Sequence, residues 1–583
     1  MKRLFAKYLL APAAFMIVFV LLKPAFMLAY GSLFQGVTFA QKMAAVWHGL
    51  SMDLSMAAYL SAVPALLLVV AQFAGPSRWL RRLEKTYYVV VAYVLAGIVI
   101  LDFGLYGYWG FRLDTMPFYY FFSSPALALA SVTPLQMLGG VLALAVLGGL
   151  FYACFYYVAV RMPYAPARSI TLDRWRRAAV ALVLAALLFL PMRGGVTVST
   201  MNVSRAYFSD NMRLNHAAVN PAFSLLYSLT QPDRYRTQFR FFDSSRAREL
   251  AAPFMAGRAS ADHTERLLRV ERPDIYLVVL ESFSAHLMPA LGGEAIAMRL
   301  DTLAREGVLF DRFYASSFRT DRGLAAIYSG LPGQPTESAT KYVGKAEHLP
   351  SLARELRDAG YDCRYYFGGD INFTNRLAYL RAQGFDRIVS DKDFPLSKRI
   401  SKWGVPDGPV FDRCMADVRD AEGSDAPRFF VVQTSSSHEP FDVPFDAPRF
   451  AEGPVRAFAY ADSCLGAFVD SLRASPSWER TLVVVVADHW GCYPAPLDSM
   501  RARHHIPLVL AGGALAAPGR RISRMAAQPD IAATLLAQLG MRAEAFPFSC
   551  NAMDTTRTGF AYASEREAAM LLLPDGEAAV FQV

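Results

Sequence analysis

The stretch Ile275-Tyr276-Leu277-Val278-Val279-Leu280 is an unbroken apolar run that ends in the acidic residue Glu281. A run of this kind, rich in aliphatic and β-branched residues, predicts a strand buried on both faces. Further strands are predicted at Val308–Tyr314, Asp362–Phe367, Phe429–Gln433, Thr481–Ala487 and Ile506–Leu510. Helical segments lie between them, near Ala295–Glu306, Leu349–Ala359, Phe411–Ala421, Arg456–Arg473 and Pro529–Leu539. This alternation predicts an α/β domain with a mostly parallel sheet covered on both faces.

The part of the chain before this domain is far more apolar. Five runs are long enough to cross a bilayer, which takes about 20 apolar residues, and they lie near Tyr8–Tyr30, Met52–Phe73, Tyr87–Gly107, Gln136–Val160 and Ala178–Pro191. The first run is longer than a cleaved signal peptide and is followed by the others, so we expect it to remain as a span. The sequence therefore predicts a transmembrane bundle of five helices over residues 1–194.

The short loops of this bundle predict its orientation. Basic residues cluster in Arg78–Lys85 and in Arg161–Arg177, whereas the two intervening loops hold only Lys42 and Arg112. By the positive-inside rule, the N-terminus lies in the cytoplasm and everything after the fifth span lies outside the cytoplasmic membrane. Because topology accounts for the basic residues, the net charge of +9 does not indicate a nucleic-acid partner.

A polar segment over residues 195–270 follows the bundle, and we expect a linker with short helices, one of them at Asn220–Leu229. The outer domain then covers residues 271–583. Five of the six cysteines follow the linker, namely Cys363, Cys414, Cys464, Cys492 and Cys550. An extracytoplasmic compartment permits disulfides, but their pairing does not follow from the sequence.

Three charged residues, Lys23, Asp53 and Asp102, lie inside or at the edges of the apolar runs. Charge at membrane depth is costly and faces either a bundle interior or a headgroup layer. One interpretation is that these side chains extend to the membrane interface. The other is that they line a groove for a lipid headgroup.

Polar residues at the ends of the predicted strands indicate a site, because ligands of parallel α/β sheets bind beyond the carboxyl ends of the strands. Glu281 follows the first strand, and Asp488-His489 follow the strand Thr481–Ala487. Two carboxylates and an imidazole are suitable ligands for a divalent cation. The alternative is that each residue is incidental, with Asp488 serving only as a helix cap.

The stretch Ser316–Gly323 lies between an apolar run and a helix-like segment, where free N–H groups favour an anion. Arg319 and Arg322 add two guanidiniums suited to phosphate or sulfate oxygens. Taken alone, Thr320 fits a helix N-cap better than a nucleophile. Beside a cation held by Glu281 and Asp488-His489, however, its hydroxyl can be activated as a nucleophile.

This set of residues predicts phosphoryl transfer. Attack of Thr320 on a phosphodiester would leave a covalent phospho-threonine, which an acceptor hydroxyl would then release. His438, in Ser435-Ser436-Ser437-His438, follows another predicted strand and could protonate the leaving group. The alternative for His438 is an ordinary histidine of a surface loop.

Four motifs carry a family resemblance: Leu280–Phe283, Arg319–Asp321, Ser437–Phe441 and Ala487–His489, all of them behind the five apolar runs. Together they resemble the lipoteichoic acid synthase family, which belongs to the alkaline phosphatase and sulfatase superfamily. The resemblance implies one metal ion of the manganese type, with zinc or magnesium as alternatives, bound by Glu281, Thr320, Asp488 and His489. It also implies a threonine nucleophile that moves glycerol phosphate from phosphatidylglycerol to a polymer or glycan.

The segment Asp370–Arg376 is similar to the substrate-contacting loop of that family. The resemblance therefore makes Asp370 and Arg376 candidates for binding the lipid headgroup. The family has a tryptophan where this chain has Thr374, so part of the headgroup pocket differs.

Three alternatives remain open. Phosphoethanolamine transferases share the five spans, the threonine nucleophile and the metal site, and would take another lipid headgroup. A sulfatase-type hydrolase needs a Cys or Ser in a Cys/Ser-x-Pro-x-Arg context, and no such motif surrounds Thr320. A catalytically idle sensor or scaffold could keep the same fold, although the intact set of site residues argues against it.

Overall fold

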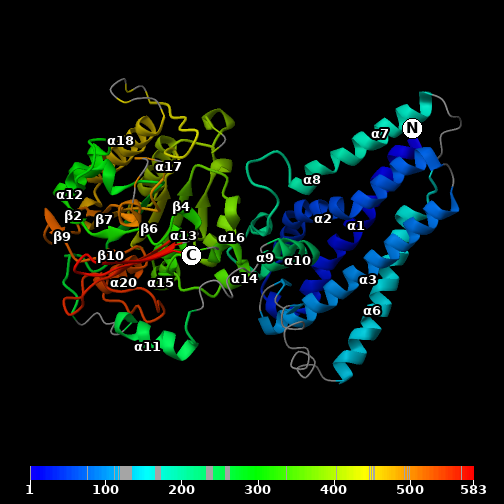
Figure 1. Ribbon diagram of the computed structural model, residues 1–583, viewed down its shortest axis with the longest axis horizontal. Helices are drawn as coiled ribbons and strands as arrows, with labels where there is room; N and C mark the ends of the chain where they lie inside the picture. The colour runs from blue at the N-terminus through cyan, green and yellow to red at the C-terminus, as the bar shows by residue number, and fades with distance from the viewer. Residues whose placement is uncertain are drawn as a thin grey trace. The chain divides into compact units, whose positions relative to one another are not determined.

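The computed structural model in Figure 1 describes residues 2–74, 77–109, 112–115, 117–118, 134–164, 172–230, 241–255, 263–335, 338–401, 403–445, 447, 450, 453–491, 493–494, 497, 499–565 and 568–582. The chain divides into two compact units, residues 1–232 and 233–583. The division falls within the segment where a linker was expected. Each unit is described by itself.

Unit 1 (residues 1–232) has five helices that are long and apolar enough to cross a membrane, at Lys2–Ala29, Phe39–Phe73, Arg78–Gly107, Pro134–Val160 and Trp175–Arg193. They correspond to α1 (Lys2–Ala29), α2 (Phe39–Ala74), α3 (Arg78–Trp109), α6 (Pro134–Phe155) with the π-helical turn Tyr156–Val160, and α7 (Leu172–Leu187) with α8 (Phe189–Arg193). The five predicted spans are confirmed as helices.

Two short helices, α9 (Met212–Ala218) and α10 (Pro221–Leu229), follow within unit 1. The helix expected at Asn220–Leu229 is thus confirmed. The Asn220 side chain caps α10 by accepting the N–H of Phe223, and Pro221 occupies the first turn, where its missing N–H costs nothing.

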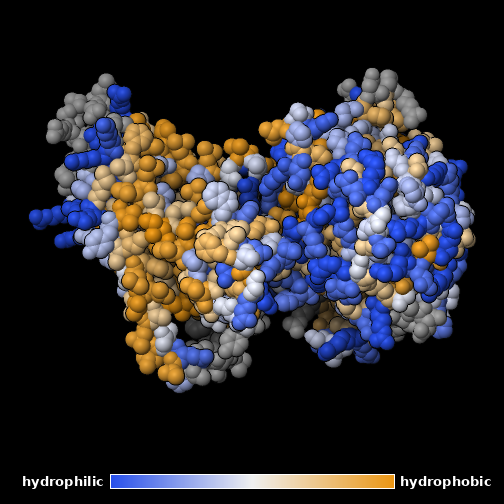
Figure 2. Space-filling model, turned by 180° about the vertical axis from the view of Figure 1, so that it is seen from behind, coloured by the Kyte–Doolittle hydropathy of each residue, from blue (hydrophilic) through white to orange (hydrophobic). Residues whose placement is uncertain are grey.

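Large apolar side chains cover much of the outside of unit 1. Leu28, Phe39, Trp47 and Leu135 are each more than two-thirds exposed. Figure 2 shows this apolar surface in orange over the helices of unit 1, in contrast to the mainly blue, hydrophilic surface of unit 2. Helices with outward-facing apolar side chains are stable in lipid, so the chain is a membrane protein.

The charged residues of the bundle form buried ion pairs. Lys23 Nζ lies 2.5 Å from Asp53 Oδ2, and an Arg112 nitrogen lies 2.7 Å from Asp102 Oδ2. The Asn220 amide donates to the other carboxylate oxygen of Asp53 at 2.9 Å. All four charged side chains are nearly inaccessible to solvent. They therefore neither extend to an interface nor line an open headgroup groove, and both interpretations made from the sequence are wrong.

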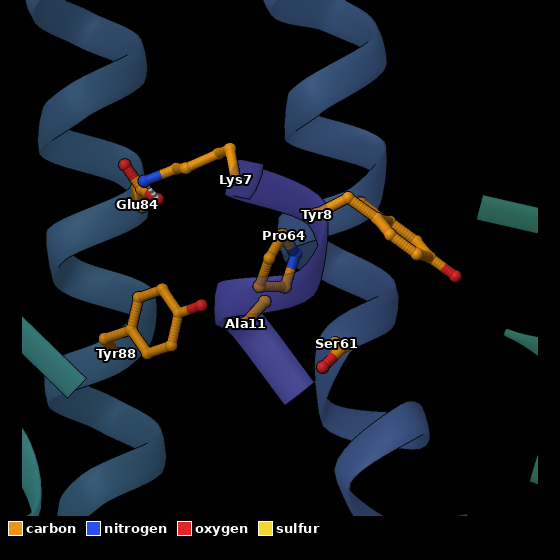
Figure 3. Close-up of a pocket in the computed structure, with 8 residues that line it drawn as sticks. Lys7, Tyr8, Ala11, Ser61, Pro64, Glu84 and Tyr88 are labelled. Carbon is orange, nitrogen blue, oxygen red and sulfur yellow. Dashed lines mark ion pairs between the residues drawn. The ribbon is translucent and has the colours of Figure 1, made fainter. Parts of the chain in front are cut away.

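A third ion pair joins α1 to α3, where Lys7 Nζ lies 2.6 Å from a Glu84 carboxylate oxygen. The same ammonium donates to the carbonyl oxygens of Ala159 and Met162 at 2.7 and 2.8 Å. Figure 3 shows the pair beside a small cavity that Ser61 also lines. Paired charges of this kind fix which helices of a bundle are neighbours, because either partner alone would be costly in lipid.

Unit 2 (residues 233–583) is built on a sheet of eight strands in the order β5-β4-β6-β1-β7-β8-β2-β9. Their bounds are β1 (Asp274–Leu280), β2 (Val308–Phe310), β4 (Asp362–Phe367), β5 (Arg387–Val389), β6 (Arg428–Gln433), β7 (Thr481–Ala487), β8 (Leu508–Ala511) and β9 (Arg520–Ile522). Only β8 runs antiparallel to its neighbours, β7 and β2. The prediction of a mostly parallel sheet is confirmed.

The strands β1, β6 and β7 are buried along their whole length, as continuous apolar runs require. The helices α12 (Met298–Glu306), α17 (Asp407–Asp420) and α18 (Pro454–Arg473) pack together on one face of the sheet. On the other face lie α13 (Thr320–Ser329), α15 (Leu352–Asp358) and α20 (Asp530–Gln538), so helices cover both faces (Figure 1).

The expected strand Val308–Tyr314 is interrupted. Its first part is β2, and its second part is β3 (Phe313–Tyr314), which leaves the large sheet and pairs with β10 (Ala526–Ala527). The break falls at Asp311, whose carboxylate accepts hydrogen bonds from Arg521 and Ser523 at the domain surface. Thr320 therefore follows a side branch of the sheet rather than a central strand.

The remaining elements of unit 2 are peripheral. They are the helices α11 (Ser244–Met255), α14 (Val343–Ala346), α16 (Arg376–Ala382) and α19 (Met500–His504), and the antiparallel sheet β11 (Ala561–Ser564), β12 (Ala568–Leu572) and β13 (Ala578–Gln582). The cysteines of the described residues, Cys154, Cys363, Cys414, Cys464 and Cys550, are free thiols. Cys492 lies outside the described residues.

Candidate functional site

Thr320 is the first residue of α13, and Arg319 before it is the N-cap residue, with the extended angles φ −146° and ψ 146°. Thr320 is therefore not the helix cap that its sequence position alone suggests. Its hydroxyl oxygen lies 3.3 Å from Glu281 Oε2 and 3.3 Å from His489 Nε2. The hydroxyl thus faces the residues that follow β1 and β7, beside the free N–H groups of the first helical turn.

Gly323 allows α13 to approach the end of β7 this closely. A Cβ atom at this position would lie 2.4 Å from the carbonyl oxygen of Asp488, which is far inside van der Waals contact. Any larger residue would therefore push the first turn of α13, and Thr320 with it, away from the strand end.

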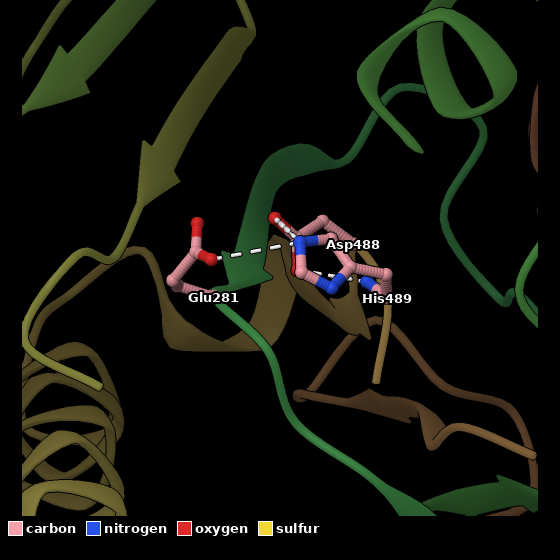
Figure 4. A group of neighbouring side chains, drawn as sticks. All are labelled: Glu281, Asp488 and His489. Carbon is pink, nitrogen blue, oxygen red and sulfur yellow. Dashed lines mark hydrogen bonds and ion pairs between the residues drawn. The ribbon is translucent and has the colours of Figure 1, made fainter. Parts of the chain in front are cut away.

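Three further residues gather at this point. Glu281, Asp488 and His489 each offer a ligand atom within 4.8 Å of the others, and all three are buried. His489 Nε2 lies 3.6 Å from Glu281 Oε1 and 3.6 Å from Asp488 Oδ2, as Figure 4 shows. The structure therefore brings together the three residues that strand-end position alone had grouped.

Hydrogen bonds orient the two carboxylates. Asp488 Oδ1 accepts the N–H groups of Ser282 and His489, each at 2.8 Å, while Asp488 Oδ2 has no hydrogen-bond partner among the described residues. The Ser282 hydroxyl donates to Glu281 Oε1 at 2.8 Å. Ser282 adopts φ 63°, a left-handed conformation that is costly for a side chain with a Cβ atom and is typical of constrained sites.

The imidazole of His489 is oriented by its other nitrogen. Nδ1 lies 2.7 Å from the carbonyl oxygen of Trp490, an acceptor, so Nδ1 carries the proton. The lone pair of Nε2 is then directed toward Glu281 and Asp488. This arrangement, a ring N–H donated to a carbonyl, is how proteins hold a histidine that binds a metal.

The electrostatics of the group favour a cation. Burial and the charge of Glu281 raise the pKa of Asp488 to about 7. Burial alone would lower the pKa of His489, but the charges of Asp488 and Glu281 raise it overall. The oxygens of Glu281, Asp488 and Thr320 with Nε2 of His489 form a ligand set suited to manganese, zinc or magnesium. The residues present therefore fit one divalent cation.

His438 lies on the loop that follows β6. Its ring is half-buried and packs on Trp403, with ring centroids 4.1 Å apart. Burial would raise the pKa of Glu281, but the charges of His489 and then His438 lower it overall, so the His438 imidazole lies within electrostatic reach of the candidate metal ligands. The Ser437 hydroxyl beside it donates to the main-chain oxygen of Glu281 at 2.6 Å, so the two loops are joined.

Asp407 and Trp403, which the sequence did not single out, bind the loop after β6 that carries His438. The carboxylate of Asp407 accepts the N–H groups of Ser435 and Ser436 at 2.8 and 3.2 Å, and the indole N–H of Trp403 donates to the carbonyl oxygen of Glu439. Asp407 is almost fully buried, and burial raises its pKa to about 6. Its position as the first residue of α17 carried no signal of this role.

The loop after β4 carries Asp370 and Arg376. Asp370 accepts the N–H of Asn372 at 3.0 Å and is half-buried. Arg376 is 6% exposed, packs over the Phe367 ring at 4.1 Å, and has two nitrogens, Nε and Nη1, without a hydrogen-bond partner in the described structure. A buried guanidinium with unused donors is suited to an anionic group. Burial raises the pKa of Tyr365, and the charges of Arg376, Asp488 and Glu281 also act on that pKa, so all three lie within electrostatic reach of this side chain.

The two arginines beside Thr320 differ from each other. Arg322 is buried with its guanidinium 4.7 Å from the centre of the Phe318 ring. Arg319 is exposed and lies 5.9 Å from the same ring. A role of either arginine in substrate binding stays a prediction.

Gln528 ties the nucleophile loop to the end of β7, and no sequence signal had indicated it. Its amide nitrogen donates to the carbonyl oxygens of Ala487 and Asp488 at 2.8 and 2.7 Å, and its amide oxygen accepts the N–H of Ser316 at 2.9 Å. A single buried amide thus connects the segments that carry Thr320 and the Asp488-His489 pair.

Comparison with known proteins agrees with this geometry. The sequence model of the sulfatase family matches residues 273–541. Lipoteichoic acid synthase 2 of Bacillus subtilis is 22% identical over 344 residues, which cover 54% of this chain and 52% of that protein. Phosphoglycerol transferase I of Escherichia coli is 23% identical over 193 residues, which cover 29% of this chain and 24% of that protein. The alignments thus span about half of the first relative and about a quarter of the second.

The fold of unit 2 is also found in a solved structure. A protein in the alkaline phosphatase superfamily from Vibrio parahaemolyticus superposes with a TM-score of 0.50 at 24% identity, covering 58% of this chain and 88% of that chain. This likeness concerns the fold alone. Residues 273–541 therefore match the sulfatase family and have an alkaline phosphatase-like fold, in a membrane protein similar to lipoteichoic acid synthases and phosphoglycerol transferases.

Proposed function

We propose that this protein is a membrane phosphotransferase that moves a phospholipid headgroup through a phospho-Thr320 intermediate to an acceptor outside the cytoplasmic membrane. One observation carries the proposal. The Thr320 hydroxyl lies within 3.3 Å of both Glu281 and His489, at the first turn of a helix and beside a buried group that fits a divalent cation. This is the arrangement that a hydroxyl nucleophile for phosphoryl transfer requires.

The residues divide the chemistry between them. Glu281 Oε2 accepts the hydrogen bond of the Thr320 hydroxyl, which directs an oxygen lone pair toward the substrate. A divalent cation bound by Glu281, Thr320, Asp488 and His489 would lower the pKa of that hydroxyl and neutralise charge on a phosphoryl oxygen. Thr320 Oγ1 gives its proton to Glu281 Oε2 and forms a bond to phosphorus, while the bond from phosphorus to the diacylglycerol oxygen breaks. His438 supplies the proton to that leaving oxygen.

The second half of the reaction reverses these roles. An acceptor hydroxyl attacks the phosphorus of phospho-Thr320 and passes its proton to His438, while Thr320 Oγ1 leaves and takes back its own proton from Glu281 Oε2. The unused donors of Arg376 suit it to hold the non-reacting phosphoryl oxygens in both steps. The proton that His438 gives up in the first step is thus returned to it in the second.

Glycerol phosphate from phosphatidylglycerol is the donor group we propose, with a polymer or glycan as acceptor and manganese as the metal. Support comes from the similarity to lipoteichoic acid synthase 2 and phosphoglycerol transferase I. Phosphatidylethanolamine is the alternative donor, because the Asp370 carboxylate in the loop after β4 could pair with an ammonium group. We infer from the basic loops that the N-terminus lies in the cytoplasm, which would put this chemistry on the outer face of the membrane.

Labelled lipid tests the proposal. The full-length protein in vesicles with manganese is incubated with phosphatidylglycerol or phosphatidylethanolamine carrying a radiolabelled headgroup, and the trapped peptide is identified by mass spectrometry. We expect label on Thr320, and loss of label and transfer in Thr320→Ala. Thr302→Ala is the matched control, because Thr302 is an exposed helical threonine that bonds only within α12. Full transfer by Thr320→Ala would overturn the proposal.

A further inference from the structure

The segment from Asp391 to Trp403 follows β5, the edge strand of the large sheet, and exposes apolar side chains. Leu396 is 77% exposed, the largest exposed fraction among the large apolar side chains of the described part of unit 2, and Ile400 is 42% exposed. Lys392 and Lys398 are exposed beside them. Asp393 is also exposed, but it lies at the start of the segment, and the tip around Leu396 and Ile400 combines apolar and basic side chains.

This segment starts and ends at the rim that carries the candidate active site. The strands β5, β4, β6 and β1 are parallel, so the loops after them leave from the same edge of the sheet. At its far end the segment returns through Trp403, whose ring centroid lies 4.1 Å from that of His438 and 5.4 Å from that of Phe373. The exposed apolar residues are therefore part of a loop that borders the site.

Hydrogen bonds hold the backbone of the loop in place. The exposed tip is therefore part of an ordered loop. Ser390 and Asp393 form a reciprocal capping box at its start. The Arg399 guanidinium bonds the carboxylate of Asp391 at 3.1 Å and its carbonyl oxygen at 2.7 Å. The N–H of Ile400 donates to the carbonyl oxygen of Gly404 at 3.1 Å. The backbone thus presents Leu396 and Ile400 outward on a closed loop.

We propose that residues 391–401 (the rim loop) insert into the surface of the lipid bilayer and bring the site rim to the donor headgroup. The proposal rests on the proposed function, since a phospholipid donor lies with its phosphate at the membrane interface. Apolar side chains that penetrate between headgroups, flanked by lysines that face anionic phosphates, are the chemistry of an interfacial anchor. Two apolar residues separated by Lys398 do not form the contiguous apolar patch that a protein partner needs.

Insertion would act on access to the lipid rather than on the chemical step. Leu396 and Ile400 are exposed, whereas the candidate metal ligands Glu281, Asp488 and His489 are buried. Replacement of Leu396 and Ile400 by a charged residue should therefore weaken capture of a lipid in a bilayer, and leave unchanged the reaction of a donor that diffuses freely in water.

The test compares two donors on the full-length protein in phosphatidylglycerol vesicles. We expect the double variant Leu396→Asp/Ile400→Asp to raise KM for long-chain phosphatidylglycerol in the bilayer by about tenfold or more, since each inserted side chain contributes apolar burial. The rate with a short-chain, monomeric phosphatidylglycerol should stay within twofold of wild type. Phe548→Asp is the matched control, because Phe548 is as exposed as Ile400 at 42% and lies far along the chain in another loop. Equal loss on both donors, or loss on neither, would overturn the proposal.

A second measurement needs no activity. In vesicles whose lipids carry brominated acyl chains, the fluorescence of Leu396→Trp, corrected for the native tryptophans, should be quenched strongly, and that of Phe548→Trp should not. If Leu396→Trp is quenched but the wild-type protein transfers no headgroup, the proposed function is wrong and the proposed membrane contact stands. If the wild-type protein transfers the headgroup but the Leu396→Trp variant shows no quenching, the proposed function stands and the proposed membrane contact is wrong.

Discussion

The side-chain amide nitrogen of Gln528 lies 2.7 Å from the carbonyl oxygen of Asp488 and donates a hydrogen bond to it. Because the other end of the same amide accepts the N–H of Ser316, this contact links the two chain segments that must meet for the proposed chemistry. The site therefore depends on a residue that touches neither substrate nor metal.

Replacing Gln528 by leucine should loosen this link. The change leaves the N–H of Ser316 and the two strand-end carbonyls without partners, and each buried unsatisfied group costs about 1–3 kcal/mol. We expect a lower melting temperature and a smaller rise in that temperature on adding manganese. Gln383→Leu is the matched control, because Gln383 is equally buried but its amide nitrogen has no partner in the described structure. An unchanged manganese response in Gln528→Leu would contradict the role given to this residue.

Gly323→Ala should impair the site without changing any functional group. The new methyl would meet the Asp488 carbonyl at 2.4 Å, so α13 has to shift and Thr320 moves with it. We expect transfer to fall by about tenfold or more, because small misplacements of a reacting group are costly. Gly139→Ala in α6 has nothing within 4 Å and should be neutral. Wild-type transfer rates for Gly323→Ala would show that the close approach is not needed.

Metal binding should depend on pH with a defined sign. The pKa of Asp488 is raised to about 7 in the ion-free protein, so below pH 7 a proton must leave before a cation binds. Apparent affinity for manganese should fall by at least about tenfold for each pH unit below 7, because His489, whose pKa the charges of Asp488 and Glu281 raise against the effect of burial, must also lose its proton before it binds a cation. Titration calorimetry in buffers of different ionisation enthalpy would count the protons released. A pH-independent affinity between pH 5.5 and about pH 7 would contradict this assignment.

Arg376→Met should make the fold more stable and at the same time weaken binding of the lipid donor. Its buried guanidinium has two nitrogens without partners, so removing the charge should raise the free energy of unfolding by about 1–3 kcal/mol. KM for the lipid donor should rise at the same time, if this arginine binds the phosphate. Arg364 is the contrasting control: it is also buried but pairs with Asp362 at 2.6 Å, so Arg364→Met should destabilise the fold. A destabilised Arg376→Met variant would show that the guanidinium is structurally satisfied.

The Lys23–Asp53 pair should behave as one unit in the bundle. Lys23→Met or Asp53→Leu alone leaves a buried charge unpaired and should lower stability by about 3–5 kcal/mol. The double variant should recover most of that loss, although the Asn220 amide loses its acceptor. The free energies of unfolding of the wild type, the two single variants and the double variant, measured in detergent, give the coupling energy of the pair. Additive losses in the double variant would mean that the two charges do not stabilise each other.

Much of the fold followed from local patterns. Buried strands such as Ile275–Leu280 and Thr481–Ala487 are continuous apolar runs, and the spans are longer runs of the same kind. Glu281 and Asp488-His489 could be grouped from the sequence alone, because parallel strands place their carboxyl ends at one edge. The interruption of Val308–Tyr314 could not be foreseen, because it depends on Asp311 meeting Arg521 and Ser523, which are distant in sequence.

The sequence by itself determined three features: the order of strands and helices, the five spans, and the types of residue at each strand end. These features depend on hydrophobic period and on neighbours along the chain. Tertiary structure alone decided that Thr320 faces Glu281 and His489, that Gln528 and Asp407 hold the loops around them, and that Lys23 meets Asp53. These contacts join segments that are far apart in the sequence. Their partners are chosen by packing and by the cost of leaving a buried polar group unpaired, which no local pattern encodes.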